Sequence, residues 1–308
     1  MWWLVSGALA ADDGRSLVVV PGAFWSQETT LGLALFGAAT ARMPGVGEDT
    51  WPSSLAAAAV GTFRRQASLT VWPSLYLGEH NTWVATGSAT LAHFPTRWYG
   101  VGPSTDGQWQ DFTRRWVRSE VSAQRRVAGD LYVGVADGLS VTALSDLGSS
   151  SLPDPLGSGV PGETGGVAHG VGPIVRWDAR DNPQSTRQGA LAAAQGLGYG
   201  RALGSRYGFT EAELDLRAFH TPTSGWATGV TFAGQLVTEL RAGEVPVAHL
   251  AELGGDNVLR GLYQGRFRDR SVVAGQVELR VPIAGRFRAA GWGGVGQVFG
   301  TAADLVST

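Results

Sequence analysis

The feature that most constrains the fold of this chain is an alternation of side-chain character with a period of two residues. From Val273 to Val281 the odd positions are Val, Gly or Leu, whereas the even positions are Ala, Gln, Glu and Arg. The same alternation recurs in 69–77 and 226–236. Successive side chains of a β-strand point to opposite faces, so the pattern predicts strands with one apolar and one polar face.

Charged residues follow the same alternation. Two groups each share one face of a predicted strand: Glu213, Asp215 and Arg217, and Arg114, Arg118 and Glu120. In a soluble β-sandwich such positions face water. In a membrane barrel they line the lumen, because an arginine on the lipid face at mid-membrane costs about 2–4 kcal/mol. The charge pattern alone is consistent with both architectures.

Composition favours the membrane barrel. Charged residues make up only 16% of the chain, well below the quarter or so that is typical of soluble domains, and hydrophobic residues make up 44%. No apolar stretch approaches the length of about 20 residues that a transmembrane helix needs, whereas a barrel strand needs only about 9–11. The net charge of −2 provides no basic field for nucleic acid, so no nucleic-acid partner is expected.

The alternating segments predict an all-β chain with strands near 16–25, 31–40, 54–63, 68–78, 82–93, 111–122, 128–137, 167–178, 189–199, 207–219, 224–239, 271–282 and 285–299. Two connections are long. Residues 139–166 are rich in Gly, Ser and Pro, which predicts an exposed loop. Residues 241–270 are too apolar and patterned for disorder, which predicts an ordered, functional loop.

The N-terminus resembles a leader. Residues 1–7 are apolar, and Ala8-Leu9-Ala10 fits an A-x-A cleavage site before Ala11. The basic region that normally precedes such a segment is missing, so we interpret residues 1–11 as a signal peptide clipped at its start. The alternative is an apolar N-terminal segment without leader function. Residues 12–308 are then expected to form one barrel domain.

Motifs for catalysis or cofactor binding are absent from the sequence. The five histidines lack metal-ligand spacing, cysteine is absent, and there is no Gly-x-Ser-x-Gly elbow. Residues 291–296 match G-x-G-x-x-G but lie within a predicted strand, which indicates packing rather than nucleotide binding. Asp178 and Asp181 favour turn capping over calcium binding. We therefore expect no enzymatic activity, no catalytic residue, no metal and no cofactor.

Four segments together resemble motifs of the BamA/TamA-like outer-membrane assembly-factor superfamily, the bacterial surface antigen barrels. Residues 254–263 (GGDNVLRGLY) resemble its "GG…(V/L)RG(F/Y)" loop, and residues 278–282 (ELRVP) resemble its "ELR.P" strand. Residues 98–102 (WYGVG) resemble its "YGIG" segment. Its "D.RDNP…G" turn is matched by Asp178, Arg180, Asp181, Asn182 and Pro183, with Gly189 following.

This resemblance implies a transmembrane antiparallel β-barrel of the 16-stranded type in the outer membrane of a Gram-negative bacterium. Members run on for several more strands, so the resemblance also implies that the last strands are missing here. The barrel then either is truncated, closes with fewer strands, or pairs its open edge with a second copy. Because the first predicted strand begins almost at the predicted cleavage site, we expect a barrel-only member without a periplasmic POTRA module.

The resemblance also assigns site residues. In the family, the loop that corresponds to 241–270 folds back into the barrel, and its arginine meets acidic residues of the lumen. This implies a lock between Arg260 and Glu278, with Gly254, Gly255 and Gly261 supplying tight or positive-φ turns. The residues 178–183 would form a periplasmic turn. A second acidic partner is not expected, because Gly294 stands where the family has an aspartate.

The function that the resemblance implies is insertion or translocation of polypeptide or lipid in the outer membrane, without bond chemistry. The expected partners are outer-membrane lipid, polypeptide or lipid clients, and a second copy of the chain at an open strand edge. Three alternatives remain: a passive pore or structural barrel, a non-functional fragment of a longer barrel protein, and a soluble β-protein.

The predicted lock has a direct test. Arg260→Ala should loosen the barrel and abolish its activity without blocking synthesis, because a buried Glu278 would lose its partner. The measurement is the temperature at which the folded gel mobility is lost in detergent. Wild-type thermal stability and activity in the variant would contradict the lock.

Overall fold

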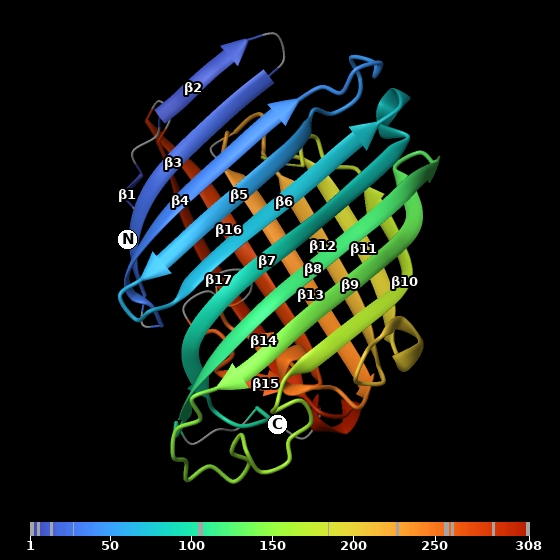
Figure 1. Ribbon diagram of the computed structural model, residues 1–308. Coiled ribbons are helices and arrows are strands. Elements are labelled where there is room, and N and C mark those ends of the chain that lie inside the picture. Colours follow the sequence, from blue (N-terminus) through green and yellow to red (C-terminus); the bar gives the residue numbers. More distant parts are fainter. Residues whose placement is uncertain are drawn as a thin grey trace.

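The computed structural model describes residues 3–4, 7–12, 15–26, 28–103, 107–183, 185–225, 228–255, 259, 262–284 and 287–305. The chain is all-β in this part, with a main antiparallel sheet of fifteen strands (Figure 1). These are β1 (Trp3–Leu4), β2 (Gly7–Asp12), β3 (Arg15–Ser26), β4 (Thr30–Ala41), β5 (Ser53–Thr62), β6 (Ala67–Leu77), β7 (Trp83–Trp98), β8 (Gln110–Ala128), β9 (Leu131–Ser145), β10 (Gly166–Asp178), β11 (Gly189–Tyr199), β12 (Phe209–His220), β13 (Thr231–Gly243), β16 (Ser271–Ala284) and β17 (Phe287–Phe299). A separate hairpin pairs β14 (Ala251–Leu253) with β15 (Phe267–Asp269).

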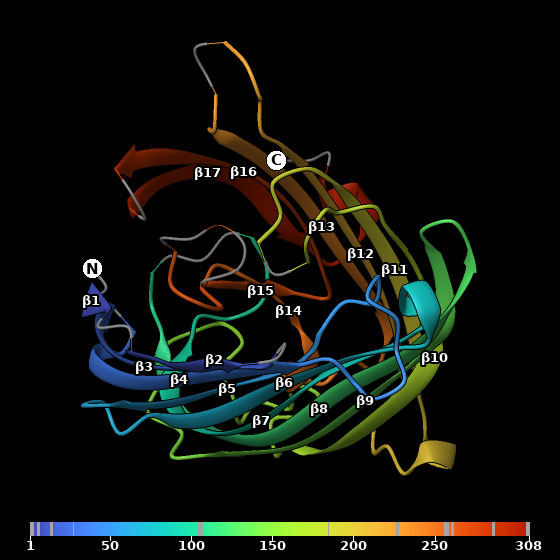
Figure 2. The same ribbon diagram turned by 90° about the horizontal axis from the view of Figure 1, so that it is seen from above.

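The strands of the main sheet follow one another in space as they do in sequence. From β3 to β13 each strand pairs with the next, and β16 and β17 continue the sheet after β13. The sheet curls strongly, so that β3 and β17 approach from opposite sides (Figure 2). Among the described residues no pairing joins β17 to β1, β2 or β3, so the described sheet is open.

Most strand boundaries agree closely with the alternation in the sequence. The thirteen predicted strands correspond to β3–β13, β16 and β17, which confirms the all-β class. The predicted ends were several residues too early for β7, β8 and β9, which run on to Trp98, Ala128 and Ser145. The predicted start was too early for β13, which begins at Thr231 because a turn closed by the Gly229 N–H and the Pro222 carbonyl precedes it. Within residues 1–11, which were assigned to a leader, β1 and most of β2 pair with β3; the leader remains a prediction.

The two faces of the curved sheet have opposite character. On β8 the concave face carries Arg114, Arg118 and Glu120, whereas Val117 and Val121 on the convex face are 51% and 47% exposed. The other strands contribute similar outward-facing aliphatic side chains, among them Leu33, Leu55, Leu91, Val135, Leu236 and Val277. The convex face is therefore apolar where a soluble sandwich would be polar.

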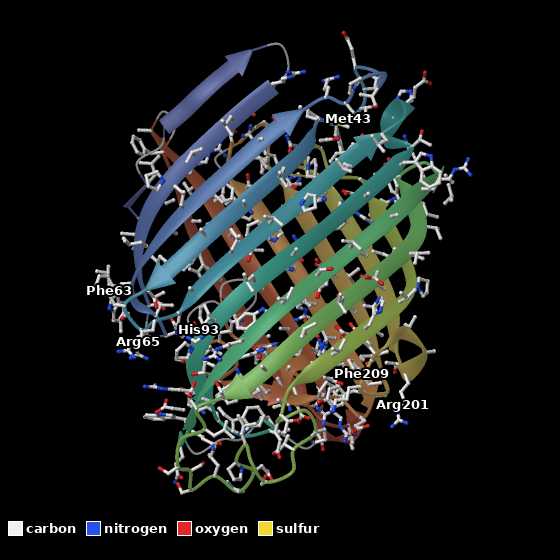
Figure 3. The ribbon with its side chains drawn as sticks, in the orientation of Figure 1. Met43, Phe63, Arg65, His93, Arg201 and Phe209 are labelled. Atoms are coloured by element: carbon white, nitrogen blue, oxygen red, sulfur yellow. The ribbon has the colours of Figure 1, made fainter. Side chains whose placement is uncertain are left out.

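The two ends of the sheet differ. We call one the loop end, because the two longest connections, 146–165 and 244–270, lie there, and the other the turn end. Figure 3 places Met43 at the turn end and Phe63, Arg65 and His93 toward the loop end. Within the described residues, no helix is long and apolar enough to cross a membrane.

The connection after β9, residues 146–165, is mostly exposed, as the sequence predicted for 139–166, but it begins later than predicted and is anchored by two buried leucines. Leu139 to Ser145 extend β9, and Leu152 and Leu156 are buried against Trp98 and Phe112. The indole N–H of Trp98 donates to the Asp154 carbonyl at 2.9 Å. A Gly/Ser/Pro-rich composition predicts turns correctly, but two leucines among them are enough to anchor such a loop.

Candidate functional site

The described residues of the connection between β13 and β16, which are 244–255, 259 and 262–270, lie inside the curve of the sheet, and we call them the inner segment. It contains the 3₁₀ turn Val247–His249 together with β14 and β15. Seen from above, β14 and β15 lie within the concave side of the sheet (Figure 2). The surrounding concave face is charged, so any polar group of the inner segment must find a partner there.

Glu252 of β14 is the electrostatic centre of the inner segment. Its Oε1 lies 3.2 Å from Arg268 Nε on β15 and 3.6 Å from Arg114 Nη1 on β8. Arg114 also donates from Nη2 to the Ala248 carbonyl at 2.9 Å. Burial raises the pKa of Glu252, but the two arginines outweigh this and hold the pKa below its usual range. The Glu252 carboxylate thus links β14 to β15 and both of them to β8 of the main sheet.

Arg268 attaches the inner segment to the end of β7. Its guanidinium lies over the Trp98 ring, 5.4 Å from the centroid, and donates to the Arg97 carbonyl at 3.4 Å. The Arg268 backbone carbonyl accepts a hydrogen bond from the Gly102 N–H at 2.7 Å. Arg268 is only 5% exposed, so the cost of burying its charge must be offset by these contacts and by Glu252.

A second polar contact lies at His249, which is 4% exposed. Its Nε2 forms a 2.6 Å hydrogen bond with the Ser140 hydroxyl of β9. Its Nδ1 lies 3.9 Å from Glu211 Oε2 of β12, beyond hydrogen-bonding distance. Burial lowers the pKa of His249, which favours the neutral ring at neutral pH.

Glu211 is held mainly by a cation of the neighbouring strand. Arg241 of β13 donates from Nη2 to Glu211 Oε1 at 3.0 Å and lies 2.8 Å from Glu239 Oε2. Tyr199 and Phe209 stack with ring centroids 4.1 Å apart, and both rings contact His249. The polar cluster is therefore enclosed by aromatic rings at the loop end.

Apolar contacts complete the attachment of the inner segment. Ala251 and Leu253 pack with Val272 and Ala274 of β16 and with Val298 of β17. Val245 packs beside Tyr199, and Val247 packs in the cluster around Trp98. The inner segment thus contacts strands on opposite sides of the curved sheet.

The lock residues that the sequence predicted are only partly described. Arg260 and Gly261 lie outside the described residues, so the pairing of Arg260 with Glu278 stays a prediction. Glu278 projects from the concave face of β16, where its Oε1 lies 2.6 Å from Arg280 Nε. Gly254 and Gly255 have φ values of +104° and +98°, and a Cβ on Gly254 would lie 2.6 Å from the Tyr263 carbonyl.

The turn motif at residues 178–183 forms a compact network of hydrogen bonds and ion pairs at the turn end. Asp178, whose side chain is 1% exposed, accepts two hydrogen bonds from Arg180, Nε at 2.7 Å and Nη2 at 2.8 Å, and a further one from Arg176. Asp181 Oδ1 accepts from the Asn182 and Arg187 backbone N–H groups at 2.9 and 3.0 Å. The Pro183 carbonyl accepts from Arg180 at 3.4 Å. Both aspartates therefore stabilise the turn itself.

Sequence reasoning missed the residues that make most of the described contacts of the inner segment. Glu252, Arg268 and His249 were not singled out, because the sequence does not show which side chains of a long connection face inward. A signal for Arg114 was present, since it shares a polar face with Arg118 in a predicted strand. Among the described residues no group of three or more His, Asp or Glu side chains could hold a metal ion.

Comparison with solved structures shows what this fold is similar to. The crystal structure of BamA from Haemophilus ducreyi lacking POTRA domains 1–3 superposes with a TM-score of 0.57 at 11% sequence identity. The match covers 99% of this chain and 64% of that chain. At this identity the likeness establishes a BamA-like fold and nothing further. No family model and no curated protein matches the chain.

The Glu252 ion pairs predict a pH-dependent stability. The folded pKa lies below the unfolded value of about 4.5, so the contribution of Glu252 is complete above that value and is lost as the pH falls toward the folded pKa. At pH 7, Glu252→Gln should lower the free energy of unfolding by about 3 kcal/mol, because the buried Arg268 and the partly buried Arg114 lose their shared carboxylate.

Urea unfolding of wild type and Glu252→Gln from pH 7 to pH 3 measures this effect. The difference between the two proteins should shrink as the pH drops below about 4.5. Glu163→Gln in the neighbouring loop is the matched control, since Glu163 caps only backbone N–H groups of that loop. A difference that is independent of pH would show that Glu252 does not act through its charge.

Proposed function

We propose that this chain forms a β-barrel wall in the outer membrane of a Gram-negative bacterium and acts in the insertion or translocation of polypeptide or lipid, without catalysing bond chemistry. The observation that carries the membrane assignment is the convex face of β8. Its outward residues between Arg115 and Arg125 are Val117, Ser119, Val121 and Ala123, with no charge among them.

The length of this uncharged stretch fits a bilayer. Ten residues at about 3.3 Å each span roughly 33 Å along the strand, which a tilt of about 40° reduces to roughly 25 Å across the membrane. That is the height of the apolar band of outer-membrane barrels. Arg125 lies over Trp83, 5.5 Å from the ring centroid, which is the aromatic-basic pairing expected at an interface.

One polar pair interrupts the convex face. His169 Nε2 of β10 lies 2.7 Å from Asp137 Oδ2 of β9, and its Nδ1 bonds to the Leu203 carbonyl at 2.8 Å. The His169 and Asp137 side chains therefore pair with each other, and the Leu203 carbonyl is a second hydrogen-bond partner of His169. Such a satisfied pair is compatible with lipid contact, whereas an isolated charge at this position would not be.

The interior favours an insertion or translocation role over a passive pore. The inner segment occupies the concave side and is fastened to β8, β9 and β16, so it restricts the interior at the loop end. Among the described residues no strand pairs with the outer edge of β17, and an open sheet edge of this kind can add a strand of a client. The BamA-like fold supports the same assignment.

Depth-dependent substitutions on β8 test the membrane assignment. Val121→Arg places a charge near the middle of the proposed band and should destabilise the inserted protein by about 2–4 kcal/mol, whereas Val127→Arg lies beyond Arg125 and should cost about 1 kcal/mol or less. Both valines face outward, at 47% and 55% exposure. Reversible unfolding from phosphatidylcholine vesicles measures the difference, and equal costs at the two sites would contradict the assignment.

Insertion activity has its own assay. Vesicles that contain the purified protein should accept an unfolded outer-membrane β-barrel client several-fold faster than empty vesicles, as measured by the client's heat-modifiable gel mobility. Vesicles with an unrelated eight-stranded barrel serve as the control. Unchanged client folding together with steady conductance in planar bilayers would support a passive pore instead.

A further inference from the structure

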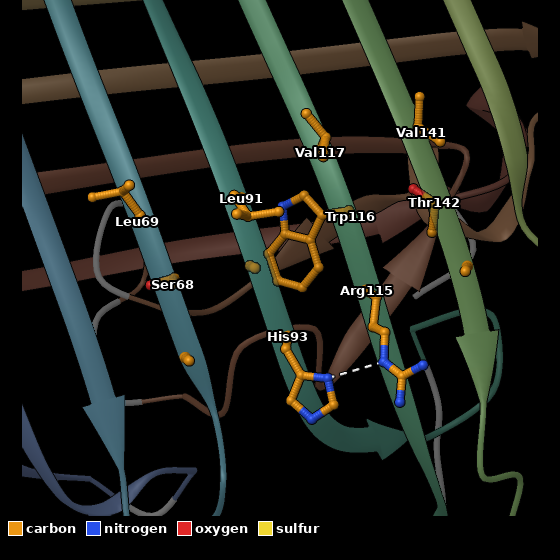
Figure 4. A pocket seen from close by; sticks show the side chains of 12 residues that line it. Ser68, Leu69, Leu91, His93, Arg115, Trp116, Val117, Val141 and Thr142 are labelled. Atoms are coloured by element: carbon orange, nitrogen blue, oxygen red, sulfur yellow. Dashed lines mark hydrogen bonds between the residues drawn. The ribbon is translucent and has the colours of Figure 1, made fainter.

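The convex face carries a groove across four strands near the loop end. It has a volume of about 590 Å³ and is lined mainly by aliphatic side chains together with His93 and Arg115. One wall is a row of outward-facing aliphatic side chains that are mutual partners in the sheet register: Leu69, Leu91, Val117 and Val141 (Figure 4). Each of the four is about half exposed although it lies in regular strand structure.

The opposite wall lies two residues nearer the loop end and is basic at its centre. Its row consists of Ala67, His93, Arg115 and Ala143, again paired in register. Two residues along a strand correspond to about 6.6 Å, so the basic pair borders the apolar row directly. The groove therefore has an aliphatic side and a cationic side.

The hydrogen bond between His93 and Arg115 orients both side chains so that each has N–H groups available to bind an anion. Arg115 Nε donates to His93 Nδ1 at 3.1 Å (Figure 4). Because Nδ1 accepts, the proton of the neutral imidazole lies on Nε2, which remains a donor. The same bond orients the guanidinium by its Nε and leaves the Nη1 and Nη2 fork for a second partner, the geometry that matches a phosphate.

The surroundings are cationic with some acidic compensation. Arg64 and Arg65 lie exposed in the turn between β5 and β6, and a second cavity of about 410 Å³ joins them to Arg97 on the same side. Asp111 lies 3.8 Å from Arg97, and the exposed Asp146 is the acidic group that interacts with Arg115 at longer range. The second cavity at the loop end is therefore lined by three arginines and two aspartates.

We propose that this groove binds an anionic, phosphate-bearing lipid, with an acyl chain along the Leu69–Val141 row and the phosphate on Arg115 and His93. The assignment rests on the proposed membrane function, because the groove meets lipid only if the convex face does. Arg115 is also the residue at which the apolar band of β8 ends, which is the depth of lipid phosphates. Charge and depth thus point to the same ligand.

Binding of lipid to the detergent-solubilised protein tests the proposal by native mass spectrometry. Phosphatidylglycerol should bind about tenfold more tightly than phosphatidylcholine, and Arg115→Ala or Arg115→Gln should remove that preference. Ala143→Phe narrows the groove without changing charge and should weaken both lipids. Arg125→Ala is the matched control on the same strand. Arg125 lies over Trp83 and does not line this groove, so the change should alter the preference less than twofold.

Four results would overturn the lipid site. These are an equal loss of preference in Arg125→Ala, displacement of the lipid by millimolar inorganic phosphate, no effect of Ala143→Phe, and a change from dimer to monomer in Arg115→Ala, which would make the groove an interface between copies. Failure of the protein to insert into phosphatidylcholine vesicles would instead overturn the membrane function and the lipid site together. Insertion without a lipid preference would overturn the lipid site alone.

Discussion

The arrangement of the interior depends on one shared carboxylate. Arg114 is a partly buried cation on the concave face of β8, and Arg268 is a buried cation on the inner segment; Glu252 lies between them. Removing a charged group from water costs several kcal/mol unless a partner compensates it, so two arginines on one carboxylate are stable only while the inner segment stays in place. The charged concave face and the inward position of the inner segment therefore require each other.

The length of β7 and β8 follows from the same requirement. β8 has 19 residues, although about ten suffice for the proposed apolar band, and its surplus lies partly at the loop end. There, Phe112 packs in the Trp98 cluster and Arg114 contacts the inner segment. In the proposed function the middle of these strands forms the membrane wall, and one end supports the inner segment.

The fold was largely predictable because a period of two residues is a local signal. The alternation located the thirteen strands β3–β13, β16 and β17, and the faces followed from which positions were charged. The contacts of the candidate site were not predictable in the same way. Glu252 and Arg114 are 138 positions apart in the numbering, and only the curl of the sheet brings them within 3.6 Å. Leu152 and Leu156 were missed for a related reason, since the burial of a loop depends on what it covers. Arg260 and Gly261 lie outside the described residues, so the pairing of Arg260 with Glu278 stays a prediction from the sequence.

Adjacent residues of β8 connect the interior to the proposed lipid site. Arg114 points inward to Glu252 and Ala248, whereas Arg115 points outward to His93. Consecutive strand residues share one rigid peptide and must face opposite sides, so any shift of β8 moves both arginines together. A phosphate held by Arg115 would therefore restrain the strand that anchors the inner segment. The lipid site and the inner segment therefore contact opposite faces of the same strand, β8. Occupancy of the groove would favour the arrangement in which Arg114 remains paired with Glu252.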